Sequence, residues 1–295
     1  MSARGSVLIT GITGFTGPYL RTALVSRDYS VVGIAGRAVS HAGDRVVDLL
    51  DRAAVGRAVQ ELRPDYIVHL AGVSFPAHDS PEDFHRVHEE GSRNLLEAVA
   101  DCGHPCRKVV LASSAYVYGR STEAEIDETA PLDPVDAYGK SKLRMELLAQ
   151  AFFDQVSVLL VRPFNYTGVG QSERFIIPKL VAHFRRRAAE IELADTSVTR
   201  EFLDVRDVAD VYVDLIESGA CSEAVNLASG VGHTVDSVIE RLTAMTGLAP
   251  RIARNSALDR KTGVPRLVGS PGKLKRLSRT SFRPLGETLK WMLKT

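Results

Sequence analysis

Two kinds of segment alternate along the first half of the chain. Short apolar runs rich in β-branched residues predict strands, and the stretches between them carry apolar residues at the spacing of amphipathic helices. The predicted strands cover residues 6–10, 29–35, 46–47, 66–71, 108–113 and 157–161. The predicted helices cover residues 19–26, 52–62, 82–100 and 137–153. Pro18 suits the first turn of one helix, and Pro64 follows the end of another.

This alternation predicts an α/β fold built on a parallel sheet. Consecutive parallel strands are joined by right-handed crossovers, and the crossing helices cover both faces of the sheet. The predicted strands are almost continuous apolar runs, as expected when both faces are buried. The pattern therefore indicates a Rossmann-type, doubly wound sheet that binds a nucleotide.

The second half of the chain is less regular. Helices are predicted over residues 173–187, 205–218, 235–245 and 285–293, with a short strand over residues 224–227. We therefore predict a nucleotide-binding domain over residues 1–165 and a smaller substrate-binding lobe over residues 166–295. Some strands and helices are expected to be exchanged between the two parts.

The composition narrows the function classes. Of 295 residues, 44% are hydrophobic and 25% charged, which is typical of a globular protein, and the formal net charge of +1 points to neither nucleic acid nor membrane. The cysteines, Cys102, Cys106 and Cys221, form no disulfide or zinc pattern and read as thiols in a reducing compartment. The chain enters its first strand without a signal peptide, and no apolar run approaches the ~20 residues of a membrane span. We therefore expect a cytoplasmic protein without a metal site.

A glycine-rich loop joins the first strand to the first helix. The run Thr10-Gly-Ile-Thr-Gly-Phe-Thr-Gly17 places glycine at positions 11, 14 and 17. Glycine allows a tight turn and a close approach to a pyrophosphate, and the helix that follows directs unpaired N–H groups at the phosphates. Turn glycines are common, but a strand before this loop and a helix after it predict a dinucleotide site.

The end of the second strand bears on the choice of dinucleotide. NAD sites carry an acidic residue about 20 positions beyond the glycines, which accepts a hydrogen bond from the ribose 2′-hydroxyl. Here the strand ends Ile34-Ala-Gly-Arg37, without a carboxylate. Arg37 can pair with a 2′-phosphate, although it can equally be an ordinary surface arginine. We predict NADP(H) as the preferred cofactor and keep NAD(H) open.

Tyr138 and Lys142 lie four residues apart at the start of a predicted helix, and so on one face of it. A nearby ammonium group lowers the pKa of a tyrosine and makes it a better proton donor and acceptor. An exposed Tyr and Lys on an ordinary helix would show the same spacing. Ser113 and Ser114 end the fifth strand, where a hydroxyl can bond a substrate carbonyl.

These features together resemble the extended branch of the short-chain dehydrogenase/reductase superfamily. The resemblance rests on the G-x-x-G-x-x-G loop after Thr10, on Ser114 and on the Tyr138/Lys142 pair. It implies that Ser114, Tyr138 and Lys142 are catalytic. It also implies that the cofactor is bound by Gly11, Thr13, Gly14, Phe15, Thr16, Gly17, Arg37, Asp48, Leu49, Leu70, Ala71, Gly72, Tyr138, Lys142 and Arg162.

The second half resembles the nucleotide-sugar members of that family. The segments are Arg162-Pro-Phe-Asn165, Arg200-Glu-Phe-Leu-Asp204 and residues 258–274, and the last is most similar to GDP-4-keto-6-deoxy-D-mannose reductases. The resemblance implies substrate contacts from Ser74, Ser114, Tyr116, Asn165, Arg200 and Arg260. Two departures concern substrate specificity: His88-Glu89 stand where the family often has Asn-Val, and Gly263 stands where close relatives have Glu.

The implied reaction is NAD(P)H-dependent reduction of the 4-keto group of a nucleotide-diphospho-4-keto-6-deoxyhexose, most of all GDP-4-keto-6-deoxy-D-mannose to GDP-D-rhamnose. Related 4,6-dehydratases carry Asp-Glu where this chain has Ala115 and Tyr116, which disfavours dehydration. An NAD-dependent nucleotide-sugar 4-epimerase and a non-catalytic NADP-sensing protein remain as alternatives. Family members commonly form homodimers through the helices predicted here over residues 82–100 and 137–153.

Overall fold

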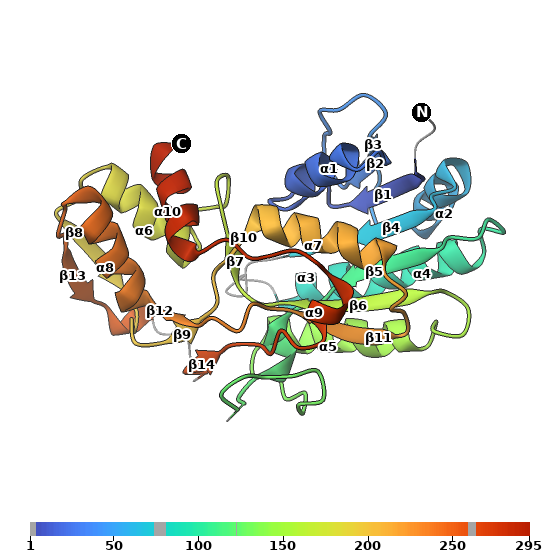
Figure 1. Cartoon of the computed structure of the whole chain (residues 1–295). Coiled ribbons are helices and arrows are strands. Elements are labelled where there is room, and N and C mark those ends of the chain that lie inside the picture. The colour runs from blue at the N-terminus through green and yellow to red at the C-terminus, as the bar shows by residue number, and fades with distance from the viewer. Residues whose placement is uncertain (1–3, 74–80, 122, 259–263) are drawn as a thin grey trace.

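The computed structural model describes residues 4–73, 81–121, 123–258 and 264–295. Its centre is a seven-stranded sheet with the strand order β11-β6-β5-β4-β1-β2-β3 (Figure 1), in which all neighbours are parallel. The strands are β1 (Ser6–Thr10), β2 (Ser30–Ala35), β3 (Arg45–Val46), β4 (Tyr66–His69), β5 (Lys108–Ala112), β6 (Val158–Pro163) and β11 (Glu223–Leu227). The predicted doubly wound α/β fold is confirmed.

The strand order reverses beside β1. The chain first adds β2 and β3 on one side of β1 and then places β4 on the other side, so that Thr10 pairs with both Ile34 and His69. Connections on either side of such a point leave the sheet in opposite directions. A crevice therefore opens at the carboxyl end of β1, where the glycine-rich loop begins.

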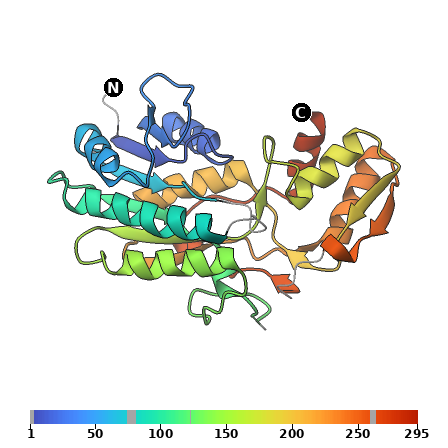
Figure 2. The same ribbon diagram turned by 180° about the vertical axis from the view of Figure 1, so that it is seen from behind.

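Helices cover both faces of the sheet (Figure 2). One face packs against α1 (Gly17–Ser26) and α7 (Val205–Glu217), and the other against α2 (Arg52–Leu62), α4 (Gly91–Ala100) and α5 (Ala137–Gln150). Alternate side chains of β1 point to opposite faces, so Val7 and Ile9 join one core and Leu8 joins the other. Both faces of the strand are buried, which explains its unbroken apolar sequence.

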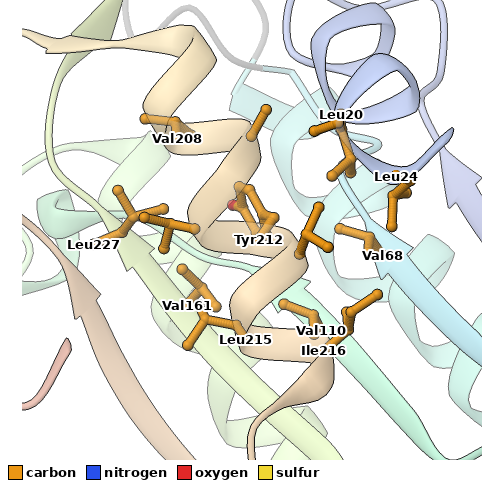
Figure 3. Packing of buried hydrophobic residues seen from close by; sticks show 14 of the residues in the cluster. Leu20, Leu24, Val68, Val110, Val161, Val208, Tyr212, Leu215, Ile216 and Leu227 are labelled. Atoms are coloured by element: carbon orange, nitrogen blue, oxygen red, sulfur yellow. The ribbon is translucent and has the colours of Figure 1, made fainter. Parts of the chain in front are cut away.

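Helix α7 lies at the centre of one of these cores (Figure 3). Tyr212 packs between Leu20 and Leu24 of α1 and the sheet residues Val68 and Val110. Every strand side chain in this contact is fully buried. The helix begins at Asp204, whose carboxylate accepts a hydrogen bond from the backbone N–H of Arg206 and caps the first turn.

Helix α7 and strand β11 come after residue 166 in the sequence but pack in the sheet part of the molecule. Strand β11 pairs with β6, and α7 covers β5 and β6. The sequence analysis placed both segments in the part assigned to the substrate lobe and expected some strands and helices to be exchanged between the two parts. Helix α7 packs against the sheet because it buries nine of its 13 residues, whereas Arg206, Asp210 and Asp214 lie along its one partly exposed side.

A smaller lobe is built from the remaining segments of the second half. Helices α6 (Ile176–Arg185), α8 (Val235–Thr246) and α10 (Leu285–Lys294) enclose its apolar core, and β8 (Glu190–Leu193) pairs with β13 (Arg251–Arg254) at its edge. The other short elements are β7 (Tyr166–Thr167), β9 (Thr199–Arg200), β10 (Leu203–Asp204), β12 (His233–Thr234), β14 (Arg266–Leu267) and α9 (Leu274–Leu277). Within the described ranges, no helix has the length and apolarity needed to cross a membrane.

The long helix predicted over residues 82–100 is interrupted. It consists of α3 (Pro81–His85), a π-helical turn over Arg86–Glu90, and α4. The N–H of Gly91 bonds the carbonyl of Arg86, so the turn holds one residue more than an α-helical turn. This wider turn directs His88 into the protein interior, where its ring nitrogens find partners in two other segments.

Candidate active site

A cavity of about 760 Å³ lies at the carboxyl ends of the strands, at the point where the strand order reverses. Its walls come from the glycine-rich loop, the ends of β2, β4 and β5, the start of α5 and residues 163–175. The predicted cofactor-binding residues that line it are Gly11, Thr13, Gly14, Phe15, Thr16, Gly17, Arg37, Asp48, Leu49, Leu70, Ala71, Gly72, Tyr138 and Lys142. The cavity therefore brings together residues that are far apart in the sequence.

The glycine-rich loop lies directly on the neighbouring backbone. A Cβ atom on Gly11, whose φ is +70°, would lie 2.8 Å from the backbone of Ala71, and one on Gly17 would lie 2.1 Å from the carbonyl oxygen of Ile12. Only glycine fits at these two positions. Thr16 precedes α1 without capping it through its side chain, so the first N–H groups of the helix face the cavity. This cradle suits a dinucleotide pyrophosphate.

The end of β2 presents a positive charge to the cavity. Residues 34–37 line it and include the exposed guanidinium of Arg37 but no carboxylate. The nearby Asp44 is held elsewhere, because it accepts hydrogen bonds from Arg21 and from the backbone N–H of Gly33. This arrangement can receive the phosphate on an adenosine ribose.

The inner end of the cavity contains Ser114, Tyr138 and Lys142. Helix α5 begins at Asp136, whose side chain caps the N–H of Gly139, and this start places Tyr138 and Lys142 on the cavity side. The side chain of Ser114 lies near enough to the phenol of Tyr138 to lower its pKa. The sequence has two adjacent serines here, of which the resemblance implied Ser114, and the structure gives the two different partners.

Ser113 and Ser114 have different partners. The hydroxyl of Ser113 donates to the buried carboxylate of Glu146 at 2.5 Å. The hydroxyl of Ser114 accepts from the backbone N–H of Tyr116 at 3.2 Å and lies at the start of a 3-10 turn over Ala115–Tyr118. Ser114 is therefore the hydroxyl that shares the reaction end of the cavity with Tyr138.

Burial dominates the electrostatics of these groups. The pKa of Tyr138 is raised because its phenolate would be desolvated, and the side chain of Ser114 only partly offsets this. Burial lowers the pKa of Lys142 to about 7, opposed by the carboxylate of Glu146. The predicted lowering of the Tyr138 pKa by Lys142 is not found within the chain, because desolvation has the largest effect on this pKa and the group that lowers it is Ser114.

The remaining predicted residues have different positions. Asn165 and Tyr116 line the cavity, and Oδ1 of Asn165 is buried without a hydrogen-bond partner in the described part of the chain. Arg200 lies on β9, where its guanidinium bonds the carbonyls of Thr199 and Val264. The predicted residues Ser74 and Arg260 lie outside the described residues.

Arg162 does not line the cavity. Its guanidinium makes a two-point contact with the carboxylate of Glu146, with N–O distances of 3.0 and 2.7 Å, and donates to the hydroxyl of Tyr118 at 2.9 Å. Arg162 is 4% exposed and Glu146 is 0% exposed. The guanidinium of Arg162 therefore belongs to a buried network between β6 and α5.

Sequence reasoning missed several residues of the cavity. Tyr166 stacks on Phe15 with ring centres 5.9 Å apart, and its hydroxyl bonds the hydroxyl of Thr16 at 2.8 Å. Val73 and Val87 add apolar surface beside Tyr138 and Ser114. Their positions depend on the return of the chain after β6 and on the π-helical turn, which local patterns do not reveal.

Residues 7–228 match the family described as "NAD dependent epimerase/dehydratase family". The chain belongs to this family. Its predicted assignment to the extended short-chain dehydrogenase/reductases and its identification as an NAD(P)-dependent oxidoreductase are thereby confirmed.

Two curated relatives are similar along most of their length. The GDP-6-deoxy-D-talose 4-dehydrogenase of Aggregatibacter actinomycetemcomitans is 29% identical over 94% of this chain and 92% of its own. The GDP-6-deoxy-D-mannose reductase of Pseudomonas aeruginosa is 29% identical over 91% of this chain and 89% of its own.

Three solved structures share the whole fold. A Burkholderia cenocepacia protein has a TM-score of 0.91 at 37% identity and covers 100% of this chain and 98% of its own. RMD from Pseudomonas aeruginosa, complexed with NADPH, has a TM-score of 0.87 at 28% identity, and Thermus thermophilus UDP-glucose 4-epimerase, complexed with NAD, has 0.86 at 25%. Both cover 98% of this chain and 98% of their own.

The pKa of Lys142 makes a pH-dependent contribution to stability. Unfolded Lys142 titrates at its ordinary value of 10.5 and folded Lys142 at about 7. Between these values the unfolded chain holds a proton that the folded chain lacks, so this contribution rises with pH. We expect the unfolding free energy of the wild type, relative to Lys142→Met, to increase between about pH 7 and pH 10 in denaturant titrations. Lys140→Met, at an exposed position on the same helix, is the matched control. If the difference in unfolding free energy between the wild type and Lys142→Met did not change with pH, the lowered pKa of Lys142 would be contradicted.

Proposed function

We propose that this protein reduces the 4-keto group of GDP-4-keto-6-deoxy-D-mannose with NADPH and forms GDP-D-rhamnose. The observation that carries the proposal is that Ser114, Tyr138 and Lys142 line the same cavity as a glycine-rich dinucleotide cradle. The names of both curated relatives, which refer to oxidation or reduction of GDP-linked 6-deoxyhexoses, support the choice of substrate.

The arrangement of the side chains explains how the carbonyl would be reduced. The hydroxyls of Ser114 and Tyr138 both bond the carbonyl oxygen at C4 of the sugar, which holds C4 at the nicotinamide end of the cavity. A nicotinamide dinucleotide bound to the glycine cradle supplies a hydride. Tyr138 donates its phenolic proton to the oxygen, so one hydride and one proton convert the ketone into an alcohol. The ammonium group of Lys142 then stabilises the phenolate left on Tyr138.

The diphosphate of the sugar nucleotide requires polar partners beyond the reaction end. Asn165 suits this role because its carboxamide lines the cavity and its Oδ1 has no partner among the described residues. We assign Arg200 to the same ligand, together with Ser74, Tyr116 and Arg260. Two arginines match the double charge of a diphosphate.

The second candidate is a nucleotide-sugar 4-epimerase that retains NAD. It would use the same Ser114, Tyr138 and Lys142, and the similarity to a UDP-glucose 4-epimerase complexed with NAD favours it. Arg37 at the end of β2 favours the reductase, because net reduction needs exchangeable NADPH. A non-catalytic NADP sensor would have no need for Ser114, Tyr138 and Lys142 together in the cavity.

Product analysis tests the reductase directly. With NADPH, we expect the purified protein to convert GDP-4-keto-6-deoxy-D-mannose into GDP-D-rhamnose, with one NADPH oxidised per sugar, as followed by absorbance and NMR. The dTDP-linked counterpart derived from glucose should react much more slowly. A sugar product inverted at C4 without net NADPH oxidation would instead support the epimerase.

Tyr138→Phe is the matched variant for this assay, because it removes only the phenolic oxygen. General acid catalysis contributes roughly 10²- to 10⁴-fold, so we expect turnover to fall by that factor while NADPH still binds. Near-normal turnover would show that Tyr138 is not the proton donor.

The cofactor preference depends on Arg37. A charge-assisted contact with a phosphate is worth about 1.5–3 kcal/mol. We therefore expect Arg37→Asp to weaken NADPH binding about 10- to 100-fold in fluorescence titrations, with a much smaller effect on NADH. Arg57→Asp makes the same charge change at an exposed position of α2 and should leave both affinities unchanged. Equal binding of NADPH and NADH by the wild type would contradict the proposal.

We further propose a homodimer formed through α4 and α5. These helices pack side by side on one face of the sheet, and Leu147 of α5 is 56% exposed. We expect Leu147→Asp to convert a dimer into a monomer in light scattering. Val25→Asp, at an equally exposed position of α1 (56%), should remain dimeric. A monomeric wild type would contradict this proposal.

A further inference from the structure

His88 has two hydrogen-bonding partners in separate segments. It lies in the π-helical turn that replaces the middle of the predicted long helix, and its side chain is fully buried. Its Nε2 accepts from the backbone N–H of Val73 at 3.1 Å, and its Nδ1 lies 2.8 Å from Oγ of Ser141. Val73 belongs to the cavity wall that follows β4, and Ser141 belongs to the first turns of α5.

These contacts determine where the imidazole proton lies. A backbone N–H can only donate, so Nε2 of His88 must be unprotonated and the ring proton must be on Nδ1. Nδ1–H then donates to Oγ of Ser141, whose own hydroxyl donates to the carbonyl of Tyr138 at 2.7 Å. The N–H of Val73, the Nδ1–H of His88 and the hydroxyl of Ser141 each donate one hydrogen bond in this series. A continuous chain of bonds therefore runs from the cavity wall to the residue that carries the reacting hydroxyl.

The imidazole of His88 is closely packed by neighbouring side chains and backbone. The His88 ring stacks on Phe84, with centres 5.9 Å apart, and meets the ring of Tyr138 edge to face at 5.8 Å. A Cβ atom on Gly72 would lie 2.8 Å from Nε2 of His88 and 3.6 Å from Nζ of Lys142. The wall backbone, His88 and Lys142 are thus in close contact at one place.

A charged imidazole would break this arrangement. Protonation of Nε2 would remove the acceptor for the N–H of Val73 and would place a second positive charge near Lys142. Burial, together with the charge of Lys142, lowers the pKa of His88. The ring therefore acts as a neutral spacer with one donor and one acceptor.

We propose that His88 is a positioning residue, which sets the cavity wall at residues 72–73 at a fixed distance from Tyr138 and so aligns the nicotinamide side of the cavity with the proton donor. The expected effect on the rate of hydride transfer rests on the proposed function. The hydrogen bonds of His88 do not depend on it. The alternative is a core histidine that only fills space, with no influence on the alignment of the site.

Three substitutions separate these roles. His88→Phe keeps the ring stacking and removes both hydrogen bonds. His88→Asn places an amide near the position of Nδ1 and can keep the bond to Ser141, whereas His88→Gln places one near Nε2 and can keep the bond to Val73. His85→Phe is the matched control, because His85 lies three residues earlier and is exposed.

The first measurement is the single-turnover rate of hydride transfer at saturating NADPH and sugar nucleotide. This first-order rate does not depend on how much protein is folded. Misplacement by about 1 Å can lower such a rate about 10²-fold, so we expect a 10- to 100-fold decrease in His88→Phe. The rates of His88→Asn and His88→Gln should lie between those of His88→Phe and the wild type, and the rate of His85→Phe should equal that of the wild type. A His88→Phe rate within about twofold of wild type would overturn the proposal.

The second measurement, amide hydrogen exchange at Val73 by NMR, needs no substrate. We expect fast exchange in His88→Phe and His88→Asn, and protection in the wild type and His88→Gln. Protection of Val73 in His88→Phe would also overturn the proposal. If Val73 is protected in the wild type and exchanges fast in His88→Phe, but the wild type reduces no sugar nucleotide, the proposed function is contradicted and the hydrogen-bonding role of His88 is not.

Discussion

The parallel pairing of β1 between β2 and β4 is the constraint on which the rest of the structure depends. Strands β2 and β4 lie on opposite sides of β1, so the loops that follow β1 and β4 diverge and leave room beyond Thr10, the last residue of β1. That room exists only because Gly11 lies against the backbone of Ala71 without a side chain between them. Beneath the loop, Oγ1 of Thr10 bonds His69 and the N–H of Ala71, which holds the two strand ends together.

A second constraint lies between β6 and α5. The ion pair between Glu146 and Arg162 is fully enclosed, and it also holds the hydroxyls of Ser113 and Tyr118. Removing one partner of such a pair costs roughly 3–5 kcal/mol, because the other charge is left buried and unpaired. The network joins the ends of β5 and β6 to α5. It thereby supports the helix that carries Tyr138 and Lys142 while its own charges stay out of the cavity.

The site can be understood as two halves that are held in register. The glycine loop forms one wall of the cavity, whereas side chains of α5 and of the end of β5 form another. Tyr166 stacks on Phe15 and bonds Thr16, so the segment after β6 is held against the glycine loop, and its neighbour Asn165 also lines the cavity. The connection from Val73 through His88 and Ser141 to Tyr138 joins the wall that follows β4 to α5.

Local sequence was sufficient for the strands, most helices, the glycine loop and the spacing of Tyr138 and Lys142 on one helix face, whereas the grouping of Ser114 with this pair was implied by the family resemblance. These features depend on short-range periodicity, on turns that require glycine and on helix spacing, which neighbouring residues determine by themselves. The tertiary structure alone decided that α7 and β11 join the sheet, that Arg162 binds Glu146 rather than lining the cavity, and that a π-helical turn directs His88 inward. Each of these depends on partners from distant segments, because a buried charge or ring is placed by whatever satisfies its polar atoms, and linear spacing does not show which segments will meet.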